Sequence, residues 1–431
     1  MPARRRPGGT TGSVPPVAVP TRNRLTPMRF VVGFGVLSML ADVVYEGARS
    51  VTGPYLATLG ASATLVGAAT GAGEAVALVA RLGTGRLVDR TGRPWALTIA
   101  GYLVTLVAVP FLALTTRAGS AIALVITERF GKALRAPARD TMLAHAGSVT
   151  GRGRAFSVHK ALDQVGSFVG PLVVSAALAA GWGYHGGFAA LAVPALLAAT
   201  ALLTLRRLVP TPSSYDETPD PTHDVPLRVS LTPTFWHYAG FTAAMMIGFA
   251  TFGVLGYHLE ARHVLAAPVV PLVYAVAMAA GALGALGSGW VYDRVGLAGL
   301  AWLPVAAAVV PWLSFSTSPV LVWVGAAIWG ATLGVQDSTM RAAVADMVPA
   351  ARRGTAYGVF AACYGLAWLV GGTLVGALYE QGVTVVGGVV GGIELVALAW
   401  FAARVLPAAR AGSRGAGASG AGRTGAGLPG R

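Results

Sequence analysis

Charged residues are scarce in this sequence. Asp, Glu, Lys and Arg together make up 11% of its 431 residues, whereas about a quarter of a typical soluble domain is charged. Apolar residues reach 55%, the mean hydropathy is +0.64, and apolar runs of about 20 residues recur from Arg29 to Leu406. This composition excludes a soluble enzyme and predicts an all-α, multi-pass membrane protein.

Cysteine and the usual catalytic motifs are also lacking. Cys363 is the single cysteine, which excludes disulfides within the chain and metal clusters built on cysteine. We find no nucleophile–base set, no phosphate-binding glycine loop and no metal-ligand spacing. These missing motifs lead us to expect no enzymatic activity, no cofactor and no metal site.

A polar leader of about 28 residues precedes the first apolar run, which is too long for a secretory signal.

The apolar runs form twelve predicted membrane spans in two sets of six. Two six-helix bundles are thus expected at 29–205 and 235–406, with a leader at 1–28, a linker at 206–234 and a tail at 407–431, of which 411–431 is predicted to be disordered. The spans lie at 30–50, 63–83, 95–115, 120–137, 155–179, 186–204, 235–257, 268–290, 298–316, 320–340, 355–378 and 383–404.

The basic residues are distributed unevenly between the two sides of these spans. The formal net charge is +15, yet the breaks on one side carry only Arg117 and Arg262, whereas most of the 32 basic residues lie on the side of both termini. The positive-inside rule then predicts cytoplasmic termini in the cell membrane. The excess charge is explained by topology, so no nucleic-acid partner is expected.

An internal repeat relates the two sets of spans. Residues 81–92 (RLGTGRLVDRTG) and 285–296 (ALGSGWVYDRVG) share six identities in twelve positions. Each segment follows the second span of its set, and a weaker echo relates residues 152–156 to 353–357. The repeat therefore predicts that the chain consists of a duplicated six-helix unit.

The segment 85–93, GRLVDRTGR, resembles the signature loop of the major facilitator superfamily, G-x-x-x-D-R-x-G-R. The resemblance implies a monomeric twelve-helix transporter whose first and fourth helices in each half face a central cavity. We expect the loop and its copy to form a conformational latch without substrate contact, in which Asp89 accepts from helix N-terminal amides and pairs with Arg93. The latch residues are Gly85, Asp89, Arg90, Gly92, Arg93, Asp293 and Arg294.

Twelve ionisable residues fall in or near the spans. Their exposure to lipid would cost on the order of 30–40 kcal/mol, so they are expected to face a polar interior. The first half holds most of them, and no role is predicted for Glu394. They are Asp42, Glu46, Arg49, Glu74, Arg81, Glu128, Arg129, Lys132, Lys160, Asp163, Asp337 and Glu394.

The acids of the first half are the candidates for proton coupling. Asp42, Glu46 and Arg49 share one face of the first span, at i, i+4 and i+7, with Tyr45 beside them. A carboxylate removed from water takes up a proton more readily, which suits loading by a proton gradient. Asp42 and Glu46 are the first candidates for the coupling proton, Asp163 is the next, and Glu128 and Glu74 follow.

A purely structural role for these acids is the alternative. Glu128 would then pair with Lys132, Asp163 with Lys160, and Asp42 or Glu46 with Arg49. Arg49 and Arg129 are candidates for binding an anionic substrate group or for a switchable ion pair.

The fifth span contains a glycine–proline segment. Gly166, Gly170 and Pro171 resemble the G-x-x-x-G-P core of the antiporter motif of drug exporters, although the following residues lack its glycine pair. We predict a hinge here, with close helix packing as the alternative.

The second half supplies few charges, so its cavity wall is expected to be apolar and aromatic. Trp329, Tyr364 and Trp368 are the predicted substrate contacts, together with Tyr45, and such a wall suits an amphiphilic substrate. The leading hypothesis is a proton antiporter for efflux of a small drug or metabolite. The alternative is a proton symporter that imports a metabolite.

Overall fold

The computed structural model describes residues 23–216, 231–348 and 352–408. Within these ranges the chain is almost entirely helical and contains no strand. Most of the predicted leader, the central part of the predicted linker and nearly all of the predicted tail lie outside the described residues.

The first half contains seven α-helices and a short 3₁₀ turn. The turn η1, Leu112–Leu114, extends α3, and residue 191 separates α6 from α7. The helices are α1 Pro27–Thr58, α2 Ala63–Thr91, α3 Pro94–Phe111, α4 Ala118–Thr150, α5 Arg152–Ala179, α6 Gly183–Ala190 and α7 Ala192–Leu208. A second 3₁₀ turn, η2 Pro212–Tyr215, follows them.

The second half repeats this order with more interruptions. Its helices are α8 Pro233–Gly248, α9 Phe252–Ala261, α10 Val270–Val295, α11 Trp302–Ser314, α12 Pro319–Asp337, α13 Thr339–Met347, α14 Arg353–Gln381 and α15 Val383–Trp400. The turns η3 Ala267–Val269 and η4 Gly296–Leu300 flank α10, and α15 continues into a π-helical turn at Phe401–Val405.

The twelve predicted spans are confirmed as helical segments. Ten helical stretches of the described chain are long and apolar enough to cross a membrane. The other two positions are filled by α4, which is long but carries many charges, and by the shorter apolar helix α11. Three of the described spans are divided between two α-helices, because α6 with α7, α8 with α9, and α12 with α13 each fill one position.

Helix ends follow local sequence signals. Thr26, Ser62 and Thr232 cap α1, α2 and α8 by accepting a hydrogen bond from a backbone amide of the first turn. Gly92 and Gly296 end α2 and α10 with φ angles of 58° and 60°, a region open to glycine without steric cost. The two glycines occupy equivalent positions of the internal repeat.

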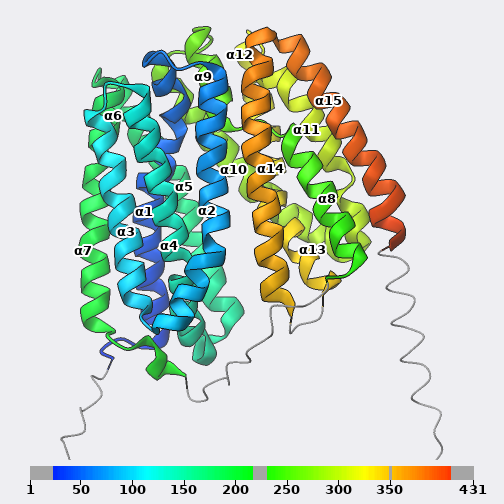
Figure 1. The fold of residues 1–431 in the computed structure, drawn as a ribbon. Helices are drawn as coiled ribbons and strands as arrows, with labels where there is room; N and C mark the ends of the chain where they lie inside the picture. Colours follow the sequence, from blue (N-terminus) through cyan, green and yellow to red (C-terminus); the bar gives the residue numbers. More distant parts are fainter. Residues whose placement is uncertain (1–22, 217–230, 349–351, 409–431) are drawn as a thin grey trace, which may run out of the picture.

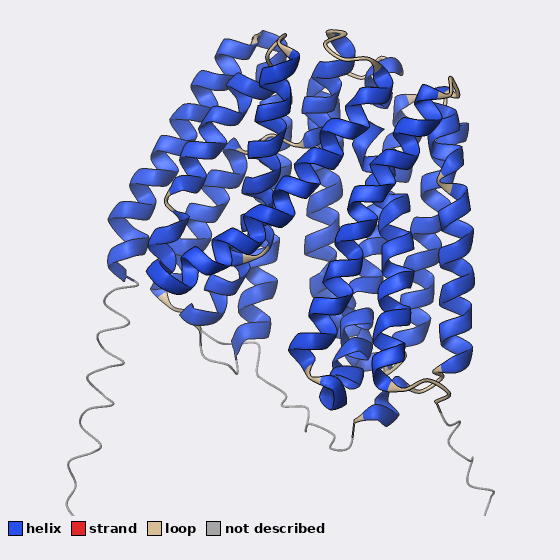
Figure 2. Ribbon diagram, turned by 180° about the vertical axis from the view of Figure 1, so that it is seen from behind, coloured by secondary structure: helices blue, strands red, loops and turns tan. Residues whose placement is uncertain are grey.

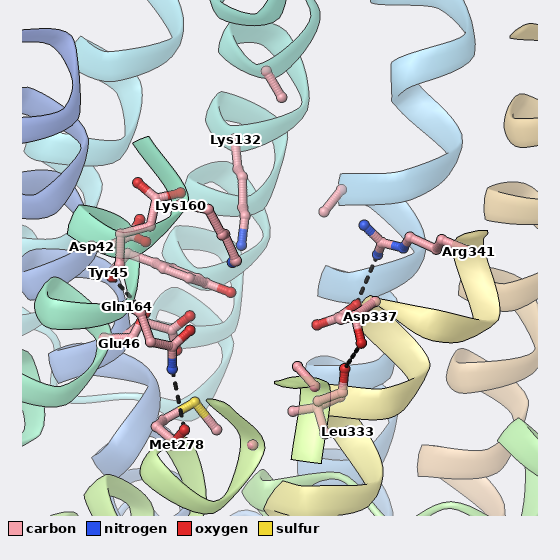
Figure 3. Close-up of a pocket in the computed structure, with 18 of the residues that line it drawn as sticks. Asp42, Tyr45, Glu46, Lys132, Lys160, Gln164, Met278, Leu333, Asp337 and Arg341 are labelled. Carbon is pink, nitrogen blue, oxygen red and sulfur yellow. Dashed lines mark hydrogen bonds and ion pairs between the residues drawn. The ribbon is translucent and has the colours of Figure 1, made fainter. Parts of the chain in front are cut away.

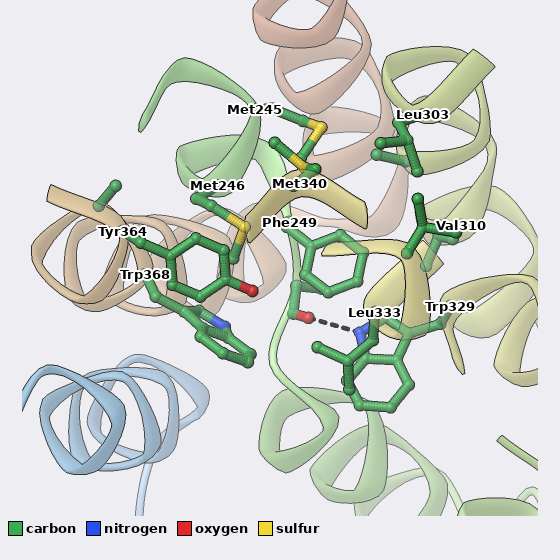
Figure 4. Packing of buried hydrophobic residues seen from close by; sticks show 14 of the residues in the cluster. Met245, Met246, Phe249, Leu303, Val310, Trp329, Leu333, Met340, Tyr364 and Trp368 are labelled. Atoms are coloured by element: carbon green, nitrogen blue, oxygen red, sulfur yellow. Dashed lines mark hydrogen bonds between the residues drawn. The ribbon is translucent and has the colours of Figure 1, made fainter. Parts of the chain in front are cut away.

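Each half packs around its own hydrophobic core. One buried cluster runs from Phe30 to Tyr215, and the other is formed by residues 235–405 with Leu78 added from α2. Figure 4 shows the second core, in which Trp329 stacks on Phe249 at 5.8 Å between ring centroids and donates from Nε1 to the Ala250 carbonyl at 2.8 Å. This bond satisfies a carbonyl freed where α8 gives way to α9.

The two bundles lie side by side, and α1 begins at the same end of the molecule at which α15 finishes (Figures 1 and 2). We call this the terminal end and the other the opposite end. Near the opposite end Thr70 Oγ1 lies 2.9 Å from Thr251 Oγ1, and Tyr184 donates to Glu260 at 2.6 Å. Among the described residues, every hydrogen bond between the halves lies at mid-depth or toward the opposite end.

Candidate functional site

A cavity of about 530 Å³ lies between the halves. Its lining runs from Arg49 and Glu74 at mid-depth to Arg139, Asp140 and Arg341 nearer the terminal end. Figure 3 shows Asp42, Glu46 and Lys132 of the first half facing Asp337 and Arg341 of the second. Hydrogen bonds between the described parts of the two halves hold the opposite end together, so the cavity is closed toward that end. Nearer the terminal end the halves meet through apolar contacts such as Leu82 with Gly358.

An arginine cluster forms the inner end of the site. Glu74 Oε1 lies 2.9 Å from Arg49 Nη2 and 3.4 Å from Arg129 Nη1. Both arginines also donate to the Tyr45 hydroxyl, and Arg129 Nε lies 3.4 Å from Glu128. The predicted substrate-binding arginines are therefore already neutralised by carboxylates. Of the cluster, Arg49, Glu74 and Tyr45 line the cavity, whereas Glu128 and Arg129 do not.

Glu46 connects the two halves. Its Oε2 accepts a hydrogen bond from the Tyr274 hydroxyl of α10 at 2.5 Å and lies 3.8 Å from Arg49 Nη1. Sequence analysis missed Tyr274, because nothing in the spacing of α10 indicates which tyrosine reaches an acid 228 positions away.

Asp42 and Asp163 lie beside one another on α1 and α5. A Cβ on Gly166, one turn from Asp163, would be 3.0 Å from the Asp42 Cβ, and the two carboxylates interact electrostatically. Asp163 Oδ2 lies 3.5 Å from His159 Nδ1, whereas Asp42 forms no hydrogen bond or ion pair within the described chain. Both acids line the cavity.

The pairing expected under the structural alternative is wrong for two of the acids. Glu128 pairs with Arg129 rather than Lys132, and Asp163 approaches His159 rather than Lys160. Both lysines line the cavity instead. The sequence could have singled these two residues out, since they are the only lysines in a chain with 32 basic residues.

Two of the three aromatic residues predicted as substrate contacts in the second half line the cavity, and the third does not. Tyr364 and Trp368 of α14 line the cavity, and Arg49 lies 5.9 Å from the Trp368 ring centroid. Trp329 is fully buried in the second core and does not line the cavity.

The glycine–proline segment of α5 packs against α1. Gly170 contacts the Val43 carbonyl, Gly166 contacts the Met39 carbonyl, and α5 continues as a helix through Pro171. The segment thus provides close helix packing, and its hinge role stays a prediction.

The signature segment is mostly helical. Residues 85–91 complete α2, so only Gly92 and Arg93 form the turn expected for the whole loop. Asp89 forms no ion pair with Arg93 within the described chain, a correction to the predicted latch. Asp89 lines a separate surface pocket together with Arg93 and the first residues of α3, and no hydrogen bond joins it to the described α3 amides.

Of the remaining latch residues, Gly85 is half-buried and Arg90, Asp293 and Arg294 are exposed. A Cβ on Gly85 would meet no neighbour within 4 Å. In the repeat copy Arg294 stacks on Trp290 at 3.3 Å from the ring centroid, and Asp293 forms no ion pair within the described residues.

Glu394 of α15 stays separate from the site. Its carboxylate is 1% exposed, lies against Gly248, and has no hydrogen-bond partner in the described part of the chain.

Comparison with known proteins decides the family. The Major Facilitator Superfamily family model matches residues 34–310 and 296–427. The chain belongs to the Major Facilitator Superfamily. It is a multi-pass membrane protein with the transporter fold of that family.

The chain is also similar to curated relatives, and its fold is similar to that of solved transporter structures. The chain is 50% identical over 392 residues to the uncharacterized proteins Mb2288 of Mycobacterium bovis and Rv2265 of Mycobacterium tuberculosis, covering 90% of this chain and 95% of each relative. The structure of the nucleoside transporter NupG has a TM-score of 0.69 at 15% identity, covering 87% of this chain and 99% of that one. A bacterial homolog of the human lysosomal transporter Spinster, inward-facing and unoccupied, has a TM-score of 0.64 at 15% identity, covering 89% and 95%.

Proposed function

We propose that the chain is a proton-coupled secondary active transporter that moves a small amphiphilic compound across the cell membrane by alternating access. The observation that carries the proposal is Asp42, an acid on the cavity wall that lacks a hydrogen-bond or ion-pair partner in the described chain and lies beside Asp163. Such an acid binds and releases a proton without first breaking an ion pair.

The proposed orientation places both termini in the cytoplasm, on the strength of the positive-inside bias. The cavity, which closes toward the opposite end, is then accessible from the cytoplasm. The complementary state requires the halves to separate where Thr70 meets Thr251 and to approach at the terminal end.

Protonation biases this equilibrium through charge. Closing the terminal end around the cavity removes Asp42 and Asp163 from water, which is costly for two like charges side by side. A proton on Asp42 removes one of the charges and the repulsion between them. Protonation therefore favours the state with the terminal end closed.

The direction of transport depends on whether proton and substrate exclude each other or bind together. Export by antiport is favoured by the resemblance of Gly166, Gly170 and Pro171 to an antiporter motif. Import by symport is favoured by Lys132 and Lys160, cations of the same cavity whose effect on an anion grows once Asp42 is neutral.

Everted membrane vesicles test the proposal. They are first equilibrated with a small-molecule extract of the cells on both sides of the membrane and then energised acid-inside, and their contents are identified by untargeted mass spectrometry. Wild type is expected to change the retention of a specific compound, and Asp42→Asn is expected to abolish that change. Asp346→Asn is the matched control, because Asp346 lies outside the cavity and accepts from Tyr292 within the second half.

Each result has a definite meaning. Accumulation that depends on Asp42 supports antiport, and depletion that depends on Asp42 supports symport. Transport that is identical in wild type and Asp42→Asn contradicts the role of Asp42, and identical contents in vesicles with and without the protein contradict proton-driven transport.

A further inference from the structure

Both lysines of the chain face the same cavity. Lys132 comes from α4 and Lys160 from α5, and Figure 3 shows the two side chains extending into the same region beside Tyr45. Lys132 Nζ lies 3.9 Å from the Tyr45 ring centroid, and neither ammonium group forms an ion pair with a described residue. Lys160 is exposed and Lys132 is half-buried, so a ligand or water that enters the cavity can compensate both charges.

Most other charges around the cavity are compensated within the protein. Arg49 is bound to Glu74, Arg139 lies 2.9 Å from Asp140, and Arg341 lies 2.8 Å from Asp337. Arg135 donates to Thr105 and stacks on Tyr102 without a carboxylate partner, and Arg81 forms no ion pair among the described residues. Asp42 and Asp163 carry the unpaired negative charge of the cavity, so the unpaired charge becomes predominantly positive once Asp42 is protonated.

The opposing wall is suited to an organic group. Tyr364 and Trp368 present aromatic surface from α14, and Leu333 adds aliphatic surface from α12. Trp368 is 4% exposed as a residue, and its Nε1 has no hydrogen-bond partner in the described chain. A ligand with one anionic end and one apolar end would match both walls.

We infer that the cavity binds an organic anion, whose carboxylate or phosphate group lies between Lys132 and Lys160 and whose apolar part lies against Tyr364 and Trp368. This inference rests on the proposed transport function and names the substrate class. Asp42 faces Asp163 on α5, Lys132 and Arg135 on α4, and Glu46 on its own helix. Neutralising Asp42 removes a negative charge next to the lysines, so proton and anion bind together, which selects the symport candidate.

Amine-directed labelling tests the anion site, because the chain has only these two lysine side chains. The probe is pyridoxal 5′-phosphate, an aromatic anion whose aldehyde condenses with a lysine amine, with loss of water, to an imine that borohydride reduces. 5′-Deoxypyridoxal, which lacks the phosphate and has no hydroxyl that could close on the aldehyde as a hemiacetal, is the matched probe. Modified lysines are located by peptide mass spectrometry of the full-length protein in detergent.

The expected result is labelling of both lysines at least about tenfold faster with the phosphate than with 5′-deoxypyridoxal at low salt, because a charged cleft concentrates a counter-ion. The preference is expected to shrink as salt is added. Equal rates with the two aldehydes, or no labelling by either, would overturn the inference, because the lysines would then form no accessible anion site.

Variants of Lys132 separate charge from structure. Lys132→Arg keeps the cation, so Lys160 should retain its preference for the phosphate, whereas Lys132→Gln should reduce that preference several-fold. Equal preferences in the two variants would contradict a shared site. If the lysines show no preference for the phosphate but the vesicles still transport in an Asp42-dependent way, only the substrate class is rejected. If the vesicles show no transport, the proposed function is rejected.

Discussion

The Tyr274 hydroxyl lies 2.5 Å from Glu46 Oε2 and joins α10 of one half to α1 of the other. A hydrogen bond to a charged group contributes about 1.5–3 kcal/mol. Because the halves must move past one another during alternating access, this bond stabilises the conformation described above, with the cavity open toward the terminal end.

Tyr274→Phe is therefore expected to shift the population toward the state with the terminal end closed, by about tenfold or more. The measurement is the distance between spin labels at Arg154→Cys on α5 and Leu286→Cys on α10, in a Cys363→Ser background. Tyr292→Phe is the control, since Tyr292 donates to Asp346 within one half. An unchanged distance distribution in Tyr274→Phe would contradict the role of this bond.

Glu74→Gln is expected to destabilise the fold. Glu74 is the carboxylate shared by Arg49 and Arg129, and removing one partner from a buried ionic cluster costs about 3–5 kcal/mol. Thermal unfolding in detergent should show a clearly lower midpoint. Asp337→Asn breaks the exposed pair with Arg341 and should cost no more than about 1 kcal/mol. Equal effects of the two changes would argue against a structural arginine cluster.

Gly170→Ala tests the contact between α5 and α1. The added Cβ would lie 2.7 Å from the Gly47 nitrogen, and overpacking of this kind costs about 1–3 kcal/mol. Gly153→Ala, on the same helix but with no neighbour within 4 Å of its Cβ, should be neutral or slightly stabilising. The comparison is made by thermal unfolding, and a Gly170→Ala protein as stable as Gly153→Ala would show that the contact carries no constraint.

The helical organisation could be predicted because apolar length, basic-residue bias and the repeat at 81–92 are local or additive properties of the chain. The repeat also predicted equivalent loops after the second span of each half, and α2 and α10 end at the equivalent glycines Gly92 and Gly296. The prediction failed for residues 85–91, which extend α2, because a glycine inside a strongly helical segment does not end a helix without a supporting signal.

The partners of the intramembrane charges could not be predicted in the same way. The i to i+4 spacing suggested an ion pair between Glu128 and Lys132. In the structure Arg129 pairs with Glu128 and also with Glu74 on α2. Contacts such as Tyr274 with Glu46 depend on how two separately folded bundles meet. Sequence spacing within one helix predicts only contacts along that helix and not the contacts between bundles.

The central claim is that protonation of Asp42 shifts the access equilibrium. The most direct test is the distance between the labels at Arg154→Cys and Leu286→Cys, measured at acidic and at alkaline pH in otherwise wild-type protein, in Asp42→Asn and in Asp346→Asn. Acidification is expected to increase the closed-terminal-end population in wild type and Asp346→Asn, because closing the cavity around a neutral carboxyl avoids burying a charge. Asp42→Asn should show a shortened distance that no longer responds to pH. A pH response in Asp42→Asn equal to that of wild type would contradict the account.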